Sequence, residues 1–205
     1  MKEVFKKENY PKLLLYIFLI YWIIMGISPH YRGAWISENL LTVFFVGLLI
    51  LTYKKFRFSN LSYTLFFIFL VLHVIGSYYS YTEMPLFNLI KDWMNLSRNH
   101  YDRVIHFLFG VMFFVPVYEF LSKKFKIKDF WGYLLTFLVI TAAKGSYEII
   151  EYLTIFVVNQ ELLVTNFLGM QGDKWDSQKD LILGMLGSGF VWLTIWIKTR
   201  FKKRN

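Results

Sequence analysis

Ionisable side chains gather where a long apolar run begins, between residues 98 and 107. The group contains two histidines, an aspartate and two arginines: Arg98, His100, Asp102, Arg103 and His106. Ionisable groups at membrane depth are costly, so such a cluster indicates a functional site. Asp102 and His106 are four residues apart and share one face of a helix. Because a carboxylate can orient an imidazole and set its tautomer, the pair is a candidate general base or set of metal ligands. The structural alternative is that Asn99 caps the helix and His106 only pairs with Asp102.

Two further groups of charged residues accompany later apolar runs. Lys144, Glu148 and Glu151 follow i, i+4 and i, i+3 spacing, which places them on one stripe of a helix. Their structural alternative is an ion pair between Lys144 and Glu148 that holds two helices together. The third group leads into the run that begins at Leu181 and contains Asp173, Lys174, Asp176 and Asp180. Ser177 and Asp180 fit a capping box, which explains one of these aspartates but not three.

The composition defines the kind of protein that must position these groups. Of 205 residues, 56% are hydrophobic, 21% are aromatic and only 18% are charged, which excludes a soluble domain with a polar exterior and indicates an integral membrane protein. The chain has no cysteine, so disulfides, thiolate nucleophiles and cysteine-ligated metals are excluded. The net charge of +9 comes from short basic clusters between apolar runs, which favours a role in topology and no nucleic-acid partner.

The pattern predicts an all-α, polytopic bundle that forms a single membrane domain over residues 1–205. Its six predicted spans cover residues 13–27, 40–53, 61–79, 104–121, 130–152 and 181–197. A polar turn from Ser28 to Asn39 is expected to separate the first two spans. After Pro85, apolar residues recur at helical spacing, which predicts an amphipathic helix in the membrane interface before span four. Residues 154–176 are predicted to fold over the mouth of the bundle as a lid.

The distribution of basic residues predicts the orientation. Four Lys and Arg residues lie in the N-terminal tail, three after span two, four after span four and five at the C-terminus, sixteen in all. Six lie in the opposite loops: Arg32, Lys91, Arg98, Arg103, Lys174 and Lys179. The positive-inside rule therefore predicts that both termini are cytoplasmic. The three charged groups then lie toward the outer face.

Convergence of these groups would create one site. We expect Asp102, His106, Glu148, Glu151, Asp176 and Asp180 to share a polar pocket about 10 Å across as the catalytic residues, with Lys144 as its floor. Close approach of helices is favoured by Gly184, Gly187 and Gly189. Two helix N-termini would point at this layer and attract anions. The expected substrate-binding residues are Arg98, His100, Arg103, Lys144, Asp173 and Lys174.

This combination suits a phosphate-bearing lipid head group. The predicted function is a hydrolase or transferase acting on a phosphorylated or lipid-linked substrate at the outer face, with membrane lipids as partners. The alternative is a non-catalytic small transporter or lipid-binding accessory protein whose carboxylates stabilise the bundle. No spacing is diagnostic of a metal, but a further set of residues offers oxygen and nitrogen ligands for a divalent cation such as Mg²⁺, Mn²⁺ or Zn²⁺: His100, His106, Glu148, Glu151, Asp176 and Asp180.

Two family resemblances follow from the longer motifs. The chain resembles the YjdF family of bacterial inner-membrane proteins over nearly its whole length. Three motifs carry this resemblance: Glu83-Met84-Pro85, residues 98–103, and Gly172-Asp173-x-Trp175-Asp176-Ser177-Gln178-Lys179-Asp180. A looser pattern resembles VanZ-like membrane proteins: Asp102-Arg103-x-x-His106-Phe107, Tyr147-Glu148-x-x-Glu151 and Asp176-x-x-x-Asp180-Leu181, although Gly184 stands where that family usually has asparagine. Both resemblances imply a small polytopic bundle in the bacterial cytoplasmic membrane. Neither implies a reaction.

Overall fold

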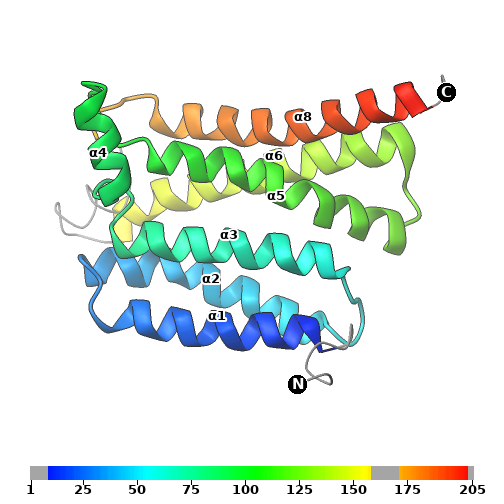
Figure 1. The fold of residues 1–205 in the computed structure, drawn as a ribbon, viewed down its shortest axis with the longest axis horizontal. Coiled ribbons are helices and arrows are strands. Elements are labelled where there is room, and N and C mark those ends of the chain that lie inside the picture. Colours follow the sequence, from blue (N-terminus) through cyan, green and yellow to red (C-terminus); the bar gives the residue numbers. More distant parts are fainter. Residues whose placement is uncertain (1–8, 158–170, 203–205) are drawn as a thin grey trace. The chain divides into compact units, whose positions relative to one another are not determined.

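The computed structural model describes residues 9–157 and 171–202, and every regular element in these ranges is a helix (Figure 1). Six long helices are α1 (Tyr10–Ile27), α2 (Arg32–Thr52), α3 (Asn60–Tyr78), α5 (Tyr101–Lys124), α6 (Asp129–Val157) and α8 (Asp176–Lys202). A short helix, α4, covers Pro85–Trp93. Within the described residues, all six long helices are long and apolar enough to cross a membrane. The predicted number of spans is therefore confirmed.

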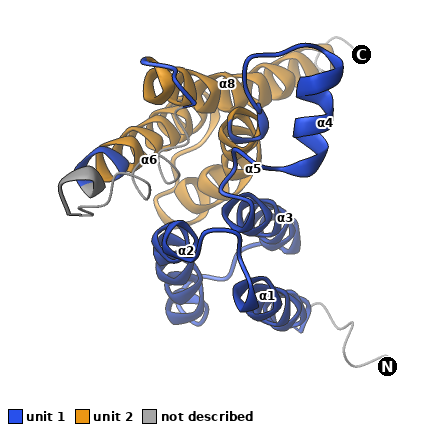
Figure 2. Cartoon of the chain, turned by 90° about the vertical axis from the view of Figure 1, so that its left-hand side faces the viewer, with its two compact units in different colours: residues 1–102, 151–174 blue, residues 103–150, 175–205 orange. Residues whose placement is uncertain are grey.

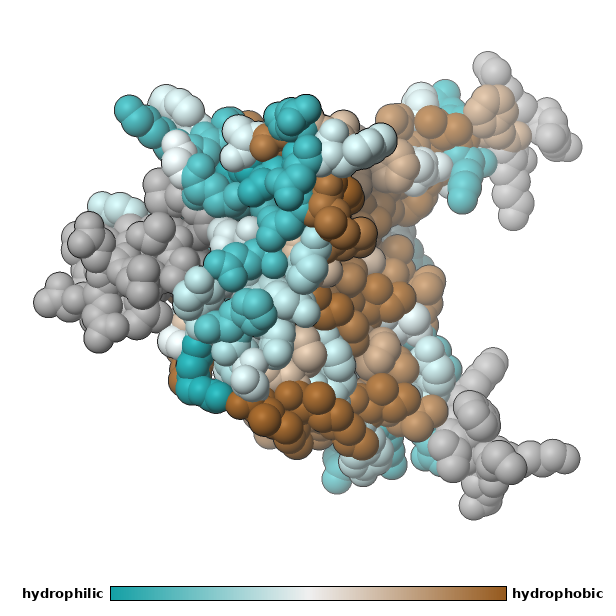
Figure 3. All heavy atoms as spheres, turned by 60° about the vertical axis from the view of Figure 1, so that its left-hand side comes forward, coloured by the Kyte–Doolittle hydropathy of each residue, from teal (hydrophilic) through white to brown (hydrophobic). Residues whose placement is uncertain are grey.

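The surface of these helices matches a lipid environment. Large apolar side chains such as Ile20, Leu51 and Phe190 are exposed along the helices. Figure 3 shows several hydrophobic patches on the face that it draws. In hydrocarbon, backbone N–H and C=O groups must be satisfied within the chain, which an α-helix does by itself. The helical conformation of the spans follows from that requirement.

Several helices begin before the predicted spans, because hydropathy marks only the apolar part of each helix. The expected polar turn from Ser28 to Asn39 is largely helical, since α2 begins at Arg32. Its polar residues are accommodated by hydrogen bonding: Asn39 donates to the backbone oxygen of Trp35 and to Ser77 Oγ, and accepts from Trp22 Nε1. The helices α5 and α8 likewise begin earlier than expected, at Tyr101 and Asp176. The key acidic residues therefore lie inside helices.

Of the two helix caps predicted for the starts of α5 and α8, only the cap of α5 is present. The side chain of Asn99 accepts a hydrogen bond from the backbone N–H of Tyr101 at 3.0 Å, which confirms it as a cap for α5. The predicted capping box at Ser177 is wrong, because α8 already begins at Asp176 and Ser177 lies exposed in its first turn. Asp176 and Asp180 are both buried.

The predicted helix after Pro85 is present as α4, with the proline in its first turn. Leu86, Leu89 and Trp93 are exposed on it. Asn99 joins α4 to the start of α5 by donating to the backbone oxygen of Met84 and to Asn88 Oδ1. The location of α4 in the membrane interface stays a prediction. Most of the predicted lid, residues 158–170, lies outside the described residues.

The chain divides into two compact units (Figure 2). Unit 1 comprises residues 1–102 and 151–174, and unit 2 comprises residues 103–150 and 175–205. The core of unit 1 forms where α1 and α2 pack on α3 around Phe18, Val46, Leu70 and Val74. The boundary between the units falls inside α5, directly after Asp102. The single membrane domain stays a prediction.

Unit 2 is built on close contact between α5 and α8. A Cβ atom added at Gly110 would lie 2.1 Å from the backbone oxygen of Gly184, and one at Gly187 would lie 2.1 Å from the backbone oxygen of Phe107. Small residues at both contacts let the two backbones approach, as is common between membrane helices. The predicted role of Gly187 in close packing is confirmed.

Both termini are predicted to be cytoplasmic, and this orientation can be measured. Because the natural chain has no cysteine, single cysteines at Lys55, Lys124 and Arg204 can be labelled without background. An impermeant maleimide should leave all three sites unlabelled in intact cells and label them after the membrane is opened. Labelling of any of them in intact cells would overturn the orientation.

Candidate functional site

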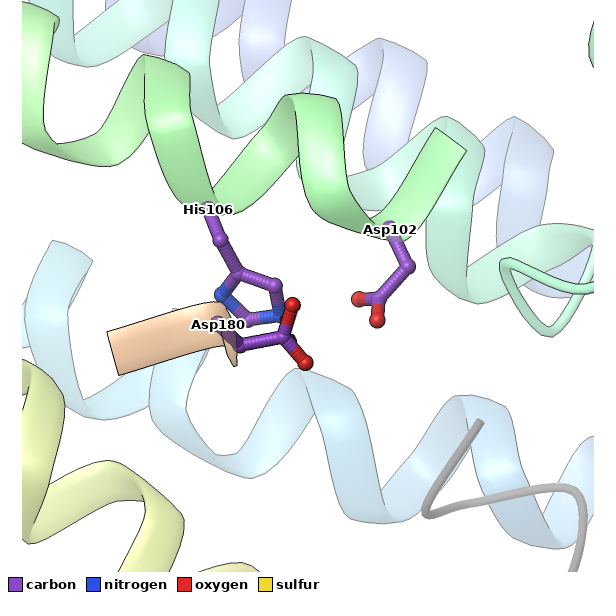
Figure 4. A group of neighbouring side chains, drawn as sticks. All are labelled: Asp102, His106 and Asp180. Carbon is purple, nitrogen blue, oxygen red and sulfur yellow. Dashed lines mark ion pairs between the residues drawn. The ribbon is translucent and has the colours of Figure 1, made fainter. Parts of the chain in front are cut away.

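The first two turns of α5 and α8 bring an imidazole and two carboxylates together (Figure 4). His106 Nε2 lies 3.8 Å from Asp180 Oδ2 in unit 2, and these side chains are only 13% and 5% exposed. Asp102 precedes His106 by one turn of the continuous helix α5, so that helix sets its position beside the imidazole. One ligand atom from each residue lies within 4.8 Å of the others. We call Asp102, His106 and Asp180 the acidic–histidine cluster.

Two ion pairs flank His106 and Asp180 within unit 2. Arg103 Nη2 lies 3.3 Å from Asp176 Oδ1, which links α5 to α8 one turn before the histidine pair. Lys144 pairs with Glu148 within α6, and both side chains are buried. The structure thus makes the Lys144–Glu148 pair an intrahelical one, whereas the structural alternative expected it to join two helices.

Lys144 also contacts α8. Its Cγ lies 3.3 Å from where a Cβ of Gly184 would be, and the backbone oxygen of His106 lies 3.7 Å from the same point. The lysine ammonium lies 5.0 Å from the centre of the Tyr147 ring, a cation–π distance. Gly184 therefore leaves room for the lysine stem beside the helix turn that carries His106.

Arg98 organises the residues that precede the cluster in unit 1. Its guanidinium lies 3.9 Å from Asp102 and 3.7 Å from Asp173, and its side chain is buried. The side-chain amide of Gln171 binds the backbone of Asn99, because its oxygen accepts from Asn99 N and its nitrogen donates to Asn99 O. Two segments distant in sequence, 98–102 and 171–173, are thereby joined.

The remaining predicted site residues take different positions. His100 is half-buried and Lys174 is exposed. Glu151 is half-buried and belongs to unit 1, whereas Glu148 belongs to unit 2. Of the six predicted catalytic residues, Asp102, His106 and Asp180 form the cluster, and Asp176 and Glu148 lie in the neighbouring ion pairs. One pocket that contains all six stays a prediction.

A second buried polar group in unit 1 was not predicted as a unit. Tyr81 Oη lies 2.6 Å from His73 Nδ1, and His73 Nε2 lies 3.4 Å from the backbone oxygen of Glu38. Since a carbonyl oxygen only accepts, Nε2 carries a proton, and in the neutral imidazole Nδ1 then accepts from Tyr81. Burial, followed by the charges of Glu38 and Asp102, raises the pKa of Tyr81 far above its usual value. Only His73, as the single ionisable residue of its apolar run, signalled this group in the sequence.

The six long helices, each long and apolar enough to cross a membrane, define an integral membrane protein. Ionisable side chains are buried near the start of two of these helices, α5 and α8. The profile of a family described as predicted membrane proteins (DUF2238) matches residues 10–201. The chain is also 32% identical over 183 residues to the inner membrane protein YjdF of Escherichia coli (strain K12), with 88% of this chain and 84% of that protein covered. The chain therefore belongs to the DUF2238 family of predicted membrane proteins, and YjdF is its relative.

The comparisons also establish the location. The protein is a multi-pass protein of the bacterial cytoplasmic membrane, as its relative and its six spans show. No solved structure matches the chain significantly. The looser VanZ-like resemblance stays a prediction.

Proposed function

We propose that this protein is a hydrolase or transferase that acts on a phosphorylated or lipid-linked substrate at the outer face of the membrane. The observation that carries the proposal is the close pair of half-buried His106 and buried Asp180, with Asp102 one helical turn from the imidazole. Ionisable side chains in a membrane span cost free energy, and the cost is largest at the centre of the span, where it is about 2.5 to 3.5 kcal/mol for an aspartate. Such a cost is typical of groups retained for function.

The chemistry follows from the side chains. A carboxylate beside an imidazole holds the ring in one tautomer and stabilises its protonated form, so His106 can take a proton from water or from a substrate hydroxyl. The N-termini of α5 and α8 both lie next to the cluster and carry partial positive charge. Together with Arg103, they favour an anionic group such as a phosphate.

The substrate class follows from the surroundings. The exposed apolar sides of the helices allow acyl or polyprenyl chains to remain in the bilayer while the head group reaches the helix ends. The predicted orientation puts those ends at the outer face. A lipid-linked phosphate meets both conditions.

The alternative is a non-catalytic transporter or lipid-binding accessory protein. It is favoured by the Arg103–Asp176 pair, which connects two helices and would stabilise the bundle without any reaction. Catalysis better explains the His106–Asp180 pair, because a structural role does not require a titratable imidazole there.

Lipid profiling tests the proposal. Cells that lack the gene should accumulate one phosphorylated or lipid-linked head-group class relative to the parent strain, because its turnover is blocked. Expression of the wild-type protein should restore the parental profile. An unchanged profile under several growth conditions would contradict the enzyme and leave the accessory role.

A further inference from the structure

We infer that Asp102, His106 and Asp180 bind one divalent cation of the Zn²⁺ or Mn²⁺ class. The inference extends the proposed function, on which its catalytic meaning rests. The three ligand atoms already lie within 4.8 Å of one another. Atoms bound to one ion at about 2.1 Å each can lie no more than about 4 Å apart. Small rotations of the two carboxylates therefore complete the site, and Figure 4 shows all three side chains pointing into the same space.

The formal charge of the ligand set suits a cation. Arg103 pairs with Asp176, and Lys144 pairs with Glu148, beside the cluster. The cluster itself holds two carboxylates and one imidazole, which carries no charge in its neutral form. Arg98 divides its single charge between Asp102 and Asp173. Two buried carboxylates and a neutral imidazole are a set of ligands whose formal charge a divalent ion offsets.

The scaffold is suited to holding an ion. His106 and Asp180 come from two helices whose backbones meet one turn further along, at Gly110 and Gly184. Close backbone contact fixes the separation of the two ligand-bearing turns. Arg98 at 3.9 Å orients the Asp102 carboxylate from outside the cluster, as residues around metal ligands commonly do.

The ligand types select the ion. Imidazole suits Zn²⁺, whereas an all-oxygen set would suit Mg²⁺ or Ca²⁺. One nitrogen and two carboxylates match Zn²⁺ or Mn²⁺, and three protein ligands leave a position for water. In catalytic protein sites, Zn²⁺ lowers the pKa of its bound water to about 7, so the water supplies hydroxide at neutral pH. With the ion bound, His106 would be a ligand, and the ion would replace it as the group that activates water. Arg103 and the helix N-termini would attract the phosphate.

Metal titration of the purified, full-length protein in detergent tests the inference. Wild-type protein stripped of metal should bind about one equivalent of Zn²⁺ or Mn²⁺. Asp180→Asn should bind at least about 100-fold more weakly, because it removes a charged ligand. Glu119→Gln is the matched control, since Glu119 is a buried carboxylate on α5 that pairs with Lys123 outside the cluster. It should bind as the wild type does.

Pulsed EPR provides a test that needs no variant. Mn²⁺ bound to the wild-type protein should show coupling to a directly bonded imidazole ¹⁴N. Wild-type protein that binds less than about a tenth of an equivalent, or Mn²⁺ without nitrogen coupling, would overturn the inference. Equal binding by Asp180→Asn and wild type would do the same.

The failures of the two proposals can be told apart. If no metal binds but a head-group class accumulates in cells without the gene, the cation site fails and a metal-free histidine base remains. If metal binds and the lipid profile never changes, the cation site stands and the enzyme fails.

Discussion

Replacing His106 by alanine, or Asp180 by asparagine, is expected to abolish the activity while leaving membrane insertion and abundance near normal. Either change removes a member of the pair that lies 3.8 Å apart, and with it the proton acceptor or the group that orients it. A positioned acid or base contributes about 10² to 10⁴ in rate. Both variants should therefore fail to restore the parental lipid profile in cells that lack the gene.

The control for these variants is Glu119→Gln, which removes a buried charge from the same helix, away from the cluster. It should restore the profile as wild type does. Immunoblots of isolated membranes report abundance for all three variants. If His106→Ala and Asp180→Asn lose abundance in parallel with activity, the cluster has a structural role. Helix capping and helix pairing would then be the better explanation of these charged residues.

A Gly187→Ala substitution is expected to disrupt unit 2. Its new Cβ would lie 2.1 Å from the backbone oxygen of Phe107 and 3.1 Å from the backbone N of Val111. The obstructing atoms are backbone, so α5 and α8 must move apart. Overpacking of this kind typically costs about 1 to 3 kcal/mol, and a rigid backbone contact places the cost at the upper end or beyond. Thermal unfolding of the purified protein should shift to a markedly lower temperature.

Gly189→Ala is the matched control on the same helix. Its Cβ would meet only the ring edge of Phe137 at 3.9 Å, an ordinary contact. Alanine is favoured over glycine within a helix by about 1 kcal/mol, so this variant should be as stable as wild type or more stable. Equal stability of the two alanine variants would show that α5 and α8 do not meet at Gly187.

The six spans could be predicted from the sequence because the bilayer imposes a strong local rule. Any run of about 20 apolar residues must satisfy its own backbone, and a helix is the solution. Pro85 and the apolar spacing after it predicted α4, and Asn99 predicted the cap of α5, because both signals act within a few residues. Helix ends such as Arg32 escaped prediction, since polar residues continue a helix when tertiary partners such as Ser77 accept their hydrogen bonds.

The sequence by itself determined which ionisable side chains share one face of a helix. Spacing of four residues put Asp102 and His106 on one face of a helix, and the same rule put Lys144 next to Glu148. Only the tertiary structure decided which residues of other helices meet them. Asp180 reaches His106 and Asp176 reaches Arg103 because glycines at positions 110, 184 and 187 let α5 and α8 touch. Periodicity defines a face of one helix, whereas the partner of that face depends on backbone packing between helices that are distant in the chain.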